Sequence, residues 1–285
     1  MNGFSISAFA DEYSADINVQ IRALKDNGVT LIEPRGVFGK NISELTEEEA
    51  EKLALLLSDA DIGISAIGSP AGKADFDHIE QHLRVYDNIL KAAKILNAKR
   101  IRGFSFYCDP QKDRDKVLKT LDRMINSASK LGILYCHENE KGIYGDTAQR
   151  CLDLIGHFGS AMGCVFDPAN FIQCGEDAEK AFDALYPHIT YMHIKDAQKD
   201  GTVTAAGEGD GHIEKMLSRF AADKRSVILT LEPHLKTFDG LSKLENGERS
   251  KIRTVFESNE EAFLYALDKL KIIIKTINTE DNDNG

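Results

Sequence analysis

Residues 189–196 read ITYMHIKD, an apolar run that ends in a cluster of His193, Lys195 and Asp196. A short run rich in β-branched and aromatic residues predicts a buried strand, and its polar end marks a place where chemistry can occur. Each of four such strands ends in Glu, Asp or His, which are metal-ligand residue types. The other three segments are ILYCHENE at 133–140, GCVFDPAN at 163–170 and SVILTLEPH at 226–234.

Outward from these strands, the chain alternates short apolar runs with segments of helical periodicity. Thr46 and Glu49 have the spacing of a capping box, which marks the start of one helix. Strands are predicted at 4–10, 31–33, 63–68, 100–106, 133–140, 163–167, 189–196 and 226–232. Helices are predicted at 16–27, from Thr46 onward, and at 77–97, 113–131, 146–158, 177–186, 213–222 and 259–277.

Eight strand-helix units of roughly 30 residues are typical of a (β/α)8 barrel, the α/β fold that we predict. A chain of 285 residues with 42% apolar content can bury the core of such a barrel. A doubly wound open sheet is the main alternative. The barrel is favoured because a closed ring brings polar strand ends from both halves of the chain together. We therefore predict a single TIM barrel domain over residues 1–277 and a polar, frayed tail at 278–285.

The formal net charge is −11, and the chain contains no block of Lys or Arg. Nucleic acids and anionic membranes are bound through positive charge, so this composition argues against both as partners. No stretch approaches 18 apolar residues, and the first residues lack the basic and apolar regions of a secretory leader. The five cysteines contain no CxxC pair, so we expect reduced thiols. From the charge we expect a small, neutral molecule as the partner, and from the first residues a cytoplasmic protein.

We predict that Glu138, Asp167, His193 and Glu232 converge on one divalent metal at the mouth of the barrel. Three carboxylates and one imidazole form a hard ligand set that suits Mn2+ first, with Mg2+, Co2+ and Zn2+ as alternatives. Each residue also has a structural alternative, respectively an ion-pair partner, a helix cap, a core histidine and a loop carboxylate. The metal is favoured for the four together, because carboxylates crowded at buried strand ends need a cation.

The succession HENE at 137–140, FDPANF at 166–171, HIKD at 193–196 and LEPH at 231–234 resembles the sugar phosphate isomerase/epimerase family of xylose isomerase-like TIM barrels. That family includes keto-sugar epimerases, inosose dehydratase, hydroxypyruvate isomerase and, more distantly, endonuclease IV. The resemblance covers nearly the whole barrel. It implies that Glu138, Asp167, His193 and Glu232 are metal ligands and that the two glutamates also form the catalytic acid/base pair.

At two positions, many members of this family have His where this chain has Glu140 and Asn170. Both positions contact substrate in relatives, so the resemblance implies that Glu140 and Asn170 are substrate contacts here. The trinuclear site of endonuclease IV needs further histidines on early strands, whereas His78 and His82 fall inside a predicted helix. Action on DNA is therefore the least favoured hypothesis.

The predicted metal would chelate a carbonyl oxygen and the neighbouring hydroxyl, which acidifies the C–H between them. Return of the removed proton on the opposite face gives epimerisation, and return at the adjacent carbon gives isomerisation. We therefore predict a metal-dependent isomerase or epimerase that acts on a keto-sugar, a cyclitol or a 3-keto-glycoside. Loss of a β-hydroxyl would instead make the enzyme a dehydratase or lyase. A sugar-binding barrel subunit without turnover is the non-enzymatic alternative.

Other polar residues are predicted to line the mouth and to bind substrate hydroxyls. They are Glu33 and Arg35 after the second strand, Lys73 after a turn, Lys195 and Asp196 after His193, and His234 after the last strand. Lys195 and Asp196 are predicted either to contact substrate or to support the metal ligands, and each of the others could equally be an exposed or ion-paired loop residue.

Two segments that connect these elements also allow predictions. Residues 207–211 (GEGDG) could form a phosphate cradle, but their two acidic side chains would repel an anion. We therefore predict a mobile loop that shapes the pocket, or a tight turn. The insertion at 235–258 includes Phe238, Leu241 and Phe256, and it could close over the pocket or meet a second subunit in a homo-oligomer.

Overall fold

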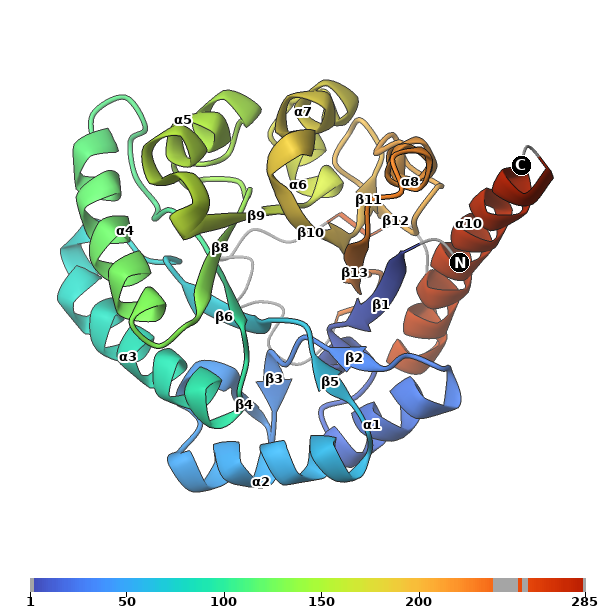
Figure 1. The fold of residues 1–285 in the computed structure, drawn as a ribbon, viewed down its shortest axis with the longest axis horizontal. Coiled ribbons are helices and arrows are strands. Elements are labelled where there is room, and N and C mark those ends of the chain that lie inside the picture. The colour runs from blue at the N-terminus through green and yellow to red at the C-terminus, as the bar shows by residue number, and fades with distance from the viewer. Residues whose placement is uncertain (1–2, 238–250, 253–255, 284–285) are drawn as a thin grey trace.

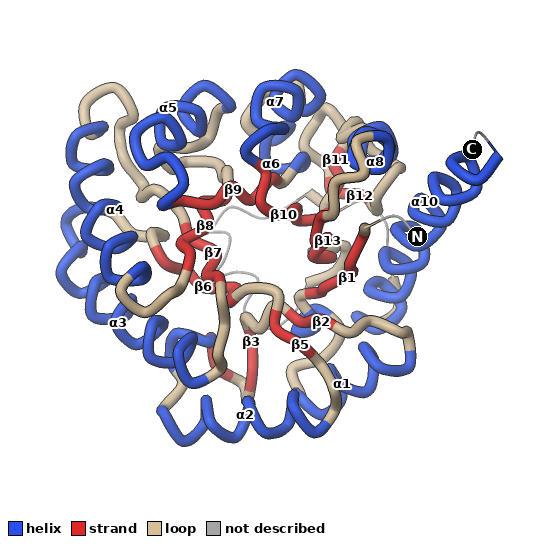
Figure 2. The backbone as a smooth tube through the Cα atoms, in the orientation of Figure 1, coloured by secondary structure: helices blue, strands red, loops and turns tan. Residues whose placement is uncertain are grey.

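The structure, a computed structural model, describes residues 3–237, 251–252 and 256–283. A ring of strands lies at the centre, and helices surround it (Figure 1; Figure 2). Parallel pairing joins the strands in the order β1 (Phe4–Ala8), β13 (Val227–Leu231), β10 (Ile189–Ile194), β9 (Met162–Phe166), β8 (Leu134–Glu138), β7 (Arg100–Gly103) and β6 (Ile67–Ala71).

The short strand β2 (Leu31–Ile32) fills the place between β1 and β6. The backbone N–H of Glu33 donates to the carbonyl of Ala8, and the N–H of Gly68 donates to the carbonyl of Pro34, both at 3.0 Å. β2 also pairs in parallel with β5 (Gly63–Ile64), which precedes β6. These bonds close the sheet into the predicted (β/α)8 barrel, so the open-sheet alternative is wrong.

Several helices begin at capping residues that the sequence makes recognisable. Asp16 accepts a hydrogen bond from the N–H of Asn18 at the start of the first helix, and Thr46 and Glu49 form the predicted capping box of the second. Such caps satisfy N–H groups that lack partners in the first helical turn. The helices are α1 (Ile17–Asp26), α2 (Glu47–Asp59), α3 (Ile79–Ile95), α4 (Arg114–Ser129), α5 (Ala148–Phe158), α6 (Pro168–Gln173), α7 (Ala178–Leu185), α8 (Ile213–Ala222) and α10 (Asn259–Asp283).

Two short antiparallel ribbons follow barrel strands. One pairs β3 (Gly36–Val37) with β4 (Lys40–Asn41), and the other pairs β11 (Asp196–Ala197) with β12 (Val203–Thr204). Within the described residues, no helix is long and apolar enough to cross a membrane.

Several predicted boundaries differ from the structure for local reasons. The first strand ends at Ala8, because Ala10–Glu12 forms a 3-10 turn, and the fourth ends at Gly103, before Phe106 adopts a positive φ of 66°. The segment after the sixth strand, to which the sequence assigns no element, contains helix α6. The last helix continues past residue 277 to Asp283, so it includes most of the tail that was predicted to fray.

Glycines make room for Tyr135 at the ends of two strands. The Tyr135 side chain is fully buried, and its hydroxyl donates to the carbonyl of Phe104 at 2.6 Å. A Cβ at Gly103 would lie 2.2 Å from the Tyr135 ring, and a Cβ at Gly72 would lie 2.1 Å from the Phe104 carbonyl oxygen. Both positions therefore require glycine.

We expect Gly72→Ala to destabilise the fold by about 1–3 kcal/mol more than Gly132→Ala. Both glycines have positive φ, 81° and 70°, so both substitutions incur the strain of a left-handed alanine. Gly72 also lacks space, whereas a Cβ at Gly132 meets no atom within 4 Å. Urea unfolding measures the difference, and equal midpoints for the two variants would contradict this explanation.

Candidate metal centre

Four side chains from neighbouring strands meet in the mouth of the barrel. Glu138 is the last residue of β8, Asp167 and Glu232 directly follow β9 and β13, and His193 lies near the end of β10. One ligand atom of each residue lies within 4.8 Å of the others, and all four residues are buried. The structure thus brings together the four residues that the sequence analysis selects as metal ligands.

Each of the three carboxylates binds the protein through one oxygen and directs the other into this cluster. Glu138 Oε2 accepts a hydrogen bond from Arg102 Nη1 at 2.9 Å, and Glu232 Oε1 accepts one from Arg35 Nη1 at 3.0 Å. Asp167 Oδ1 caps the N-terminus of α6. The helix-cap alternative for Asp167 is therefore correct for one oxygen, and the other oxygen is still available to a ligand.

The oxygens that face the cluster fit a cation. Asp167 Oδ2 and Glu232 Oε2 are buried and accept no hydrogen bond from the described residues. Lys195 Nζ lies 2.9 Å from the first and 3.7 Å from the second, and Arg35 binds the other oxygen of Glu232. Buried carboxylate oxygens that accept no hydrogen bond are costly. Together with His193, these oxygens form a donor set that could hold a divalent metal ion.

His193 is oriented by a glutamate on the side opposite the cluster. Its Nδ1 lies 2.9 Å from Glu138 Oε1, while its Nε2 lies 3.3 Å from Glu33 Oε2. Glu33 is fully buried, and it accepts a hydrogen bond from the Thr230 hydroxyl at 2.9 Å. Glu33 is predicted from the sequence to contact substrate, but the structure places it behind His193, where it can fix the imidazole in one orientation.

Burial and neighbouring charges move the pKa values of the carboxylates in opposite directions. Burial raises the pKa of Glu138, but His193 and Arg102 outweigh burial and lower this pKa to about 2. Burial raises the pKa of Asp167 to about 6, although Lys195 acts against the rise. Glu138 is therefore ionised at neutral pH, as a metal ligand must be.

Lys73 and Glu140, two predicted substrate contacts, pair with each other near the surface. Nζ of Lys73 lies 3.0 Å from Oε2 of Glu140 and 4.5 Å from the centre of the Phe104 ring. Their side chains are 11% and 16% exposed, more than those of the four clustered residues. They therefore lie nearer the surface than the cluster, and their contact with substrate stays a prediction.

Asn170 and His234 adjoin the two glutamates that are predicted to be catalytic. Asn170 Nδ2 lies 3.4 Å from Glu138 Oε1 and donates to the carbonyl of Asn139 at 2.9 Å. His234 follows β13 with a positive φ of 48°, and its Nε2 lies 3.4 Å from Glu232 Oε1. Both residues therefore adjoin the candidate metal centre, and their contact with substrate stays a prediction.

Asp196 has a different role from the substrate contact that the sequence predicts. Its two oxygens accept hydrogen bonds of 2.8–3.1 Å from the N–H groups of Ala197, Gly207, Gly209 and Gly211. A Cβ at Gly209 or Gly211 would lie 2.3 or 2.5 Å from Asp196 Oδ1, so both positions require glycine. The glycine-rich segment is a turn folded around an internal anion, and the prediction of a mobile loop is wrong.

We expect Asp196→Asn to lower the free energy of unfolding by on the order of 2 kcal/mol, because an amide turns a donor toward N–H donors. Amide exchange at Gly209 and Gly211 should become faster in this variant. Asp210→Asn is the matched control, since Asp210 lies in the same turn and accepts an exposed hydrogen bond from the N–H of Lys199. Hydrogen-deuterium exchange that is equally fast in both variants would disprove the anchoring role of Asp196.

Three further residues, which the sequence does not single out, shape the cluster. Arg102 binds Glu138, Thr230 binds Glu33, and the Asn139 side chain exchanges two 2.9 Å hydrogen bonds with the backbone of Asp167. A charged residue inside a short apolar strand is a usable signal for Arg102. Thr230 has no comparable signal, because threonine is common in strands.

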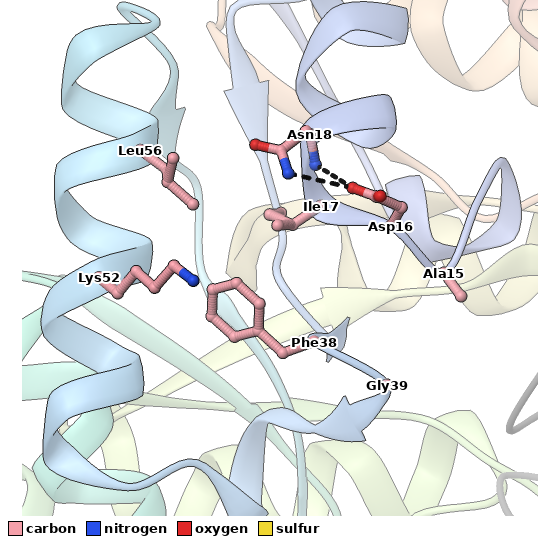
Figure 3. Close-up of a pocket in the computed structure, with 8 residues that line it drawn as sticks. All are labelled: Ala15, Asp16, Ile17, Asn18, Phe38, Gly39, Lys52 and Leu56. Atoms are coloured by element: carbon pink, nitrogen blue, oxygen red, sulfur yellow. Dashed lines mark hydrogen bonds between the residues drawn. The ribbon is translucent and has the colours of Figure 1, made fainter.

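A surface groove lies apart from this cluster, between α1, the β3–β4 ribbon and α2 (Figure 3). Phe38, Lys52 and Leu56 line it together with the start of α1. Asp16, the polar residue at that helix start, is engaged as the helix cap. None of the four clustered residues lines the groove, so it is separate from the candidate metal centre.

Most of the insertion at 235–258 lies outside the described residues, including Phe238 and Leu241. Phe256 is buried, and Ile252 forms an isolated bridge with Val203 of β12. The expectations that the insertion covers the pocket or meets a second subunit stay predictions.

The comparisons with known proteins concern the family and the fold. The family model described as "Xylose isomerase-like TIM barrel" matches residues 21–251. A D-psicose 3-epimerase from Clostridium cellulolyticum H10, solved with D-tagatose, is similar in structure with a TM-score of 0.73 and 14% identity, over 96% of this chain and 99% of that chain. A probable 3-DHS dehydratase from Bacillus anthracis has a TM-score of 0.67 and 16% identity, over 80% and 92%.

A xylose isomerase-like TIM barrel protein from Mycobacterium smegmatis, solved in complex with magnesium, has a TM-score of 0.68 and 13% identity, over 96% of this chain and 97% of that chain. None of the curated proteins matches this chain in sequence. At such identities, likeness to solved structures shows a shared fold. The family match confirms the resemblance that the four motifs carry.

Proposed function

Because this chain belongs to the xylose isomerase-like TIM barrel family, we propose that it is a divalent-metal-dependent isomerase or epimerase of a carbohydrate. The observation that carries the proposal is the buried cluster of Glu138, Asp167, His193 and Glu232. The substrate we propose is a keto-sugar, a cyclitol or a 3-keto-glycoside. An enzymatic role is supported by the epimerase and the dehydratase among the structures of similar fold.

The proposed reaction is proton transfer at the carbon beside a carbonyl group. When bound, a divalent ion supplies Lewis acidity, which stabilises the negative charge that develops on the carbonyl oxygen as the neighbouring C–H is deprotonated. We expect Mn2+ in this role, with Mg2+, Co2+ and Zn2+ as alternatives. Asp167 and His193 complete the set of residues that would hold the ion.

We propose that Glu138 and Glu232 act on two sides of a substrate. They come from β8 and from the end of β13, and β9 and β10 lie between these two strands in the sheet. One carboxylate can remove the proton from one face, and the other can return a proton to the opposite face. Arg102 and Arg35 each hold one oxygen of these glutamates, so the reactive oxygens are fixed in direction.

Lys195 favours a second candidate function, dehydration of the same class of substrate. Its Nζ lies 2.9 Å from Asp167 Oδ2, and its side chain is 5% exposed. Burial lowers the pKa of Lys195, but Asp167 and Glu232 outweigh burial and raise it above its ordinary value, so the ammonium keeps its proton. A fixed positive charge beside the cluster could stabilise the negative charge that develops on the oxygen of a departing β-hydroxyl.

The proposal is tested by metal content and isotope exchange in the same samples. Purified protein loaded with Mn2+ should hold about one ion per chain, measured by elemental analysis. In D2O it should then exchange deuterium into the carbon beside the carbonyl of a ketose, an inosose or a 3-keto-glycoside. Glu138→Gln and Glu232→Gln should weaken Mn2+ binding by at least about tenfold, or ~1.4 kcal/mol, and abolish exchange.

Glu140→Gln is the control for these variants, because Glu140 lies outside the ligand cluster and pairs with Lys73. It should keep the Mn2+ affinity of the wild type. Water loss with formation of an unsaturated product would identify a dehydratase. Sugar binding without exchange or elimination across the panel would identify a non-catalytic barrel, and a wild-type protein without metal affinity would refute the proposal.

Glu33→Ala should weaken Mn2+ binding by about 10- to 100-fold, because His193 loses the acceptor that directs Nδ1 into the cluster. Glu33→Gln keeps an acceptor oxygen and should retain more of the affinity. Calorimetric titration of Mn2+ into the metal-free proteins measures both effects. Wild-type affinity in a folded Glu33→Ala protein would show that Glu33 does not position His193.

A further inference from the structure

A second group of ligand atoms adjoins the candidate metal centre. It consists of Glu12, Glu232 and His234, whose ligand atoms lie within 4.8 Å of one another and which are all buried. His234 Nε2 lies 3.4 Å from Glu12 Oε1 and 3.4 Å from Glu232 Oε1. The backbone N–H of His234 donates to Glu12 Oε2 at 2.7 Å, so the two residues are held together. Glu232 belongs to both groups.

A cation already lies among these ligand atoms, the guanidinium of Arg35. Its Nη2 lies 3.1 Å from Glu12 Oε1, and its Nη1 lies 3.0 Å from Glu232 Oε1. Nε and Nη2 bind both oxygens of Asp11, at 2.9 and 3.1 Å. The guanidinium also stacks over the Phe9 ring at 4.3 Å, so its place is set by packing as well as by charge.

We propose that Arg35 takes the place of a second divalent ion and thereby restricts this barrel to one metal per chain. The inference rests on the metal centre proposed above, and it identifies the residue that limits the number of metal ions bound per chain. The guanidinium occupies the same oxygens that Glu12 and Glu232 would offer to a second ion, and its charge repels such an ion. An arginine keeps its proton under all conditions in proteins, so this built-in cation neither titrates nor dissociates.

The shared glutamate explains why the two positions are linked. Arg35 binds Glu232 Oε1, which leaves Oε2 facing His193 Nδ1 at 3.3 Å in the first cluster. Without Arg35, Glu232 could bridge two ions through its two oxygens. Paired metal ions are a common device for phosphate-ester hydrolysis, whereas a single ion beside acid/base groups suits chemistry at a carbonyl.

The test is the metal stoichiometry of Arg35→Ala, measured by elemental analysis after saturation with Mn2+ and again with Zn2+. The wild type should hold about one ion per chain and Arg35→Ala about two. Two Mn2+ ions that share Glu232 should also broaden the electron paramagnetic resonance spectrum relative to the wild type. Loss of both Glu12 and His234 from this variant, as Glu12→Gln and His234→Ala, should restore one ion per chain.

Arg102→Ala is the matched control, because Arg102 is also buried and binds the other ligand glutamate, Glu138. Among the described residues no second ligand group includes Glu138, so this variant should not gain an ion. Arg35→Ala that stays at one ion per chain under saturation, or a second ion that persists without Glu12 and His234, would overturn the proposal. A wild type without metal would instead refute the proposed metal centre.

Arg35→Ala could unfold without metal, since it leaves buried carboxylates uncompensated. Thermal melting with and without Mn2+ or Zn2+ then decides the question. The inference predicts that metal raises the melting temperature of Arg35→Ala by more than that of the wild type or of Arg102→Ala. An equal rise in all three proteins would overturn it.

Discussion

The mouth of this barrel depends on the compensation of buried carboxylates by cations. Glu138 and Glu232 each accept a hydrogen bond from an arginine through one oxygen, and Asp167 lies beside Lys195, yet two carboxylate oxygens still lack hydrogen-bond donors among the described residues. An uncompensated buried charge costs several kcal/mol. The positions of the fixed cations therefore decide which oxygens are left for a metal ion and which are permanently occupied.

The barrel tolerates this concentration of buried charge, because the clustered side chains also make contacts that stabilise the fold. One oxygen of Asp167 caps α6, and the far nitrogen of His193 faces Glu33, which Thr230 holds in turn. Asp196 likewise stabilises the fold away from the cluster, since a turn of glycine N–H groups donates hydrogen bonds to its carboxylate. The turn therefore binds an anion, but this anion is the Asp196 carboxylate and not a phosphate group.

The proposed chemistry follows from where the charged side chains lie in the site. Glu138 and Glu232 face the cluster from strands on either side of it, which suits proton removal and return, while Lys195 adds a fixed positive charge suited to elimination. The pair of Lys73 and Glu140 lies nearer the surface, where contact with the outer part of a substrate would set specificity. Isomerisation and dehydration share their first step, so this arrangement is compatible with both.

The sequence by itself determined the succession of the barrel strands, the capping box of α2 and the four ligand-type residues, because these depend on local periodicity and residue type. Only the tertiary structure decided what faces each side chain. Glu33 and Asp196 were predicted to contact substrate, yet Glu33 lies behind His193 and Asp196 binds a turn. The contact of Arg102 with Glu138 was not predicted. Such roles depend on contacts between residues far apart in the chain, which the closure of the ring creates.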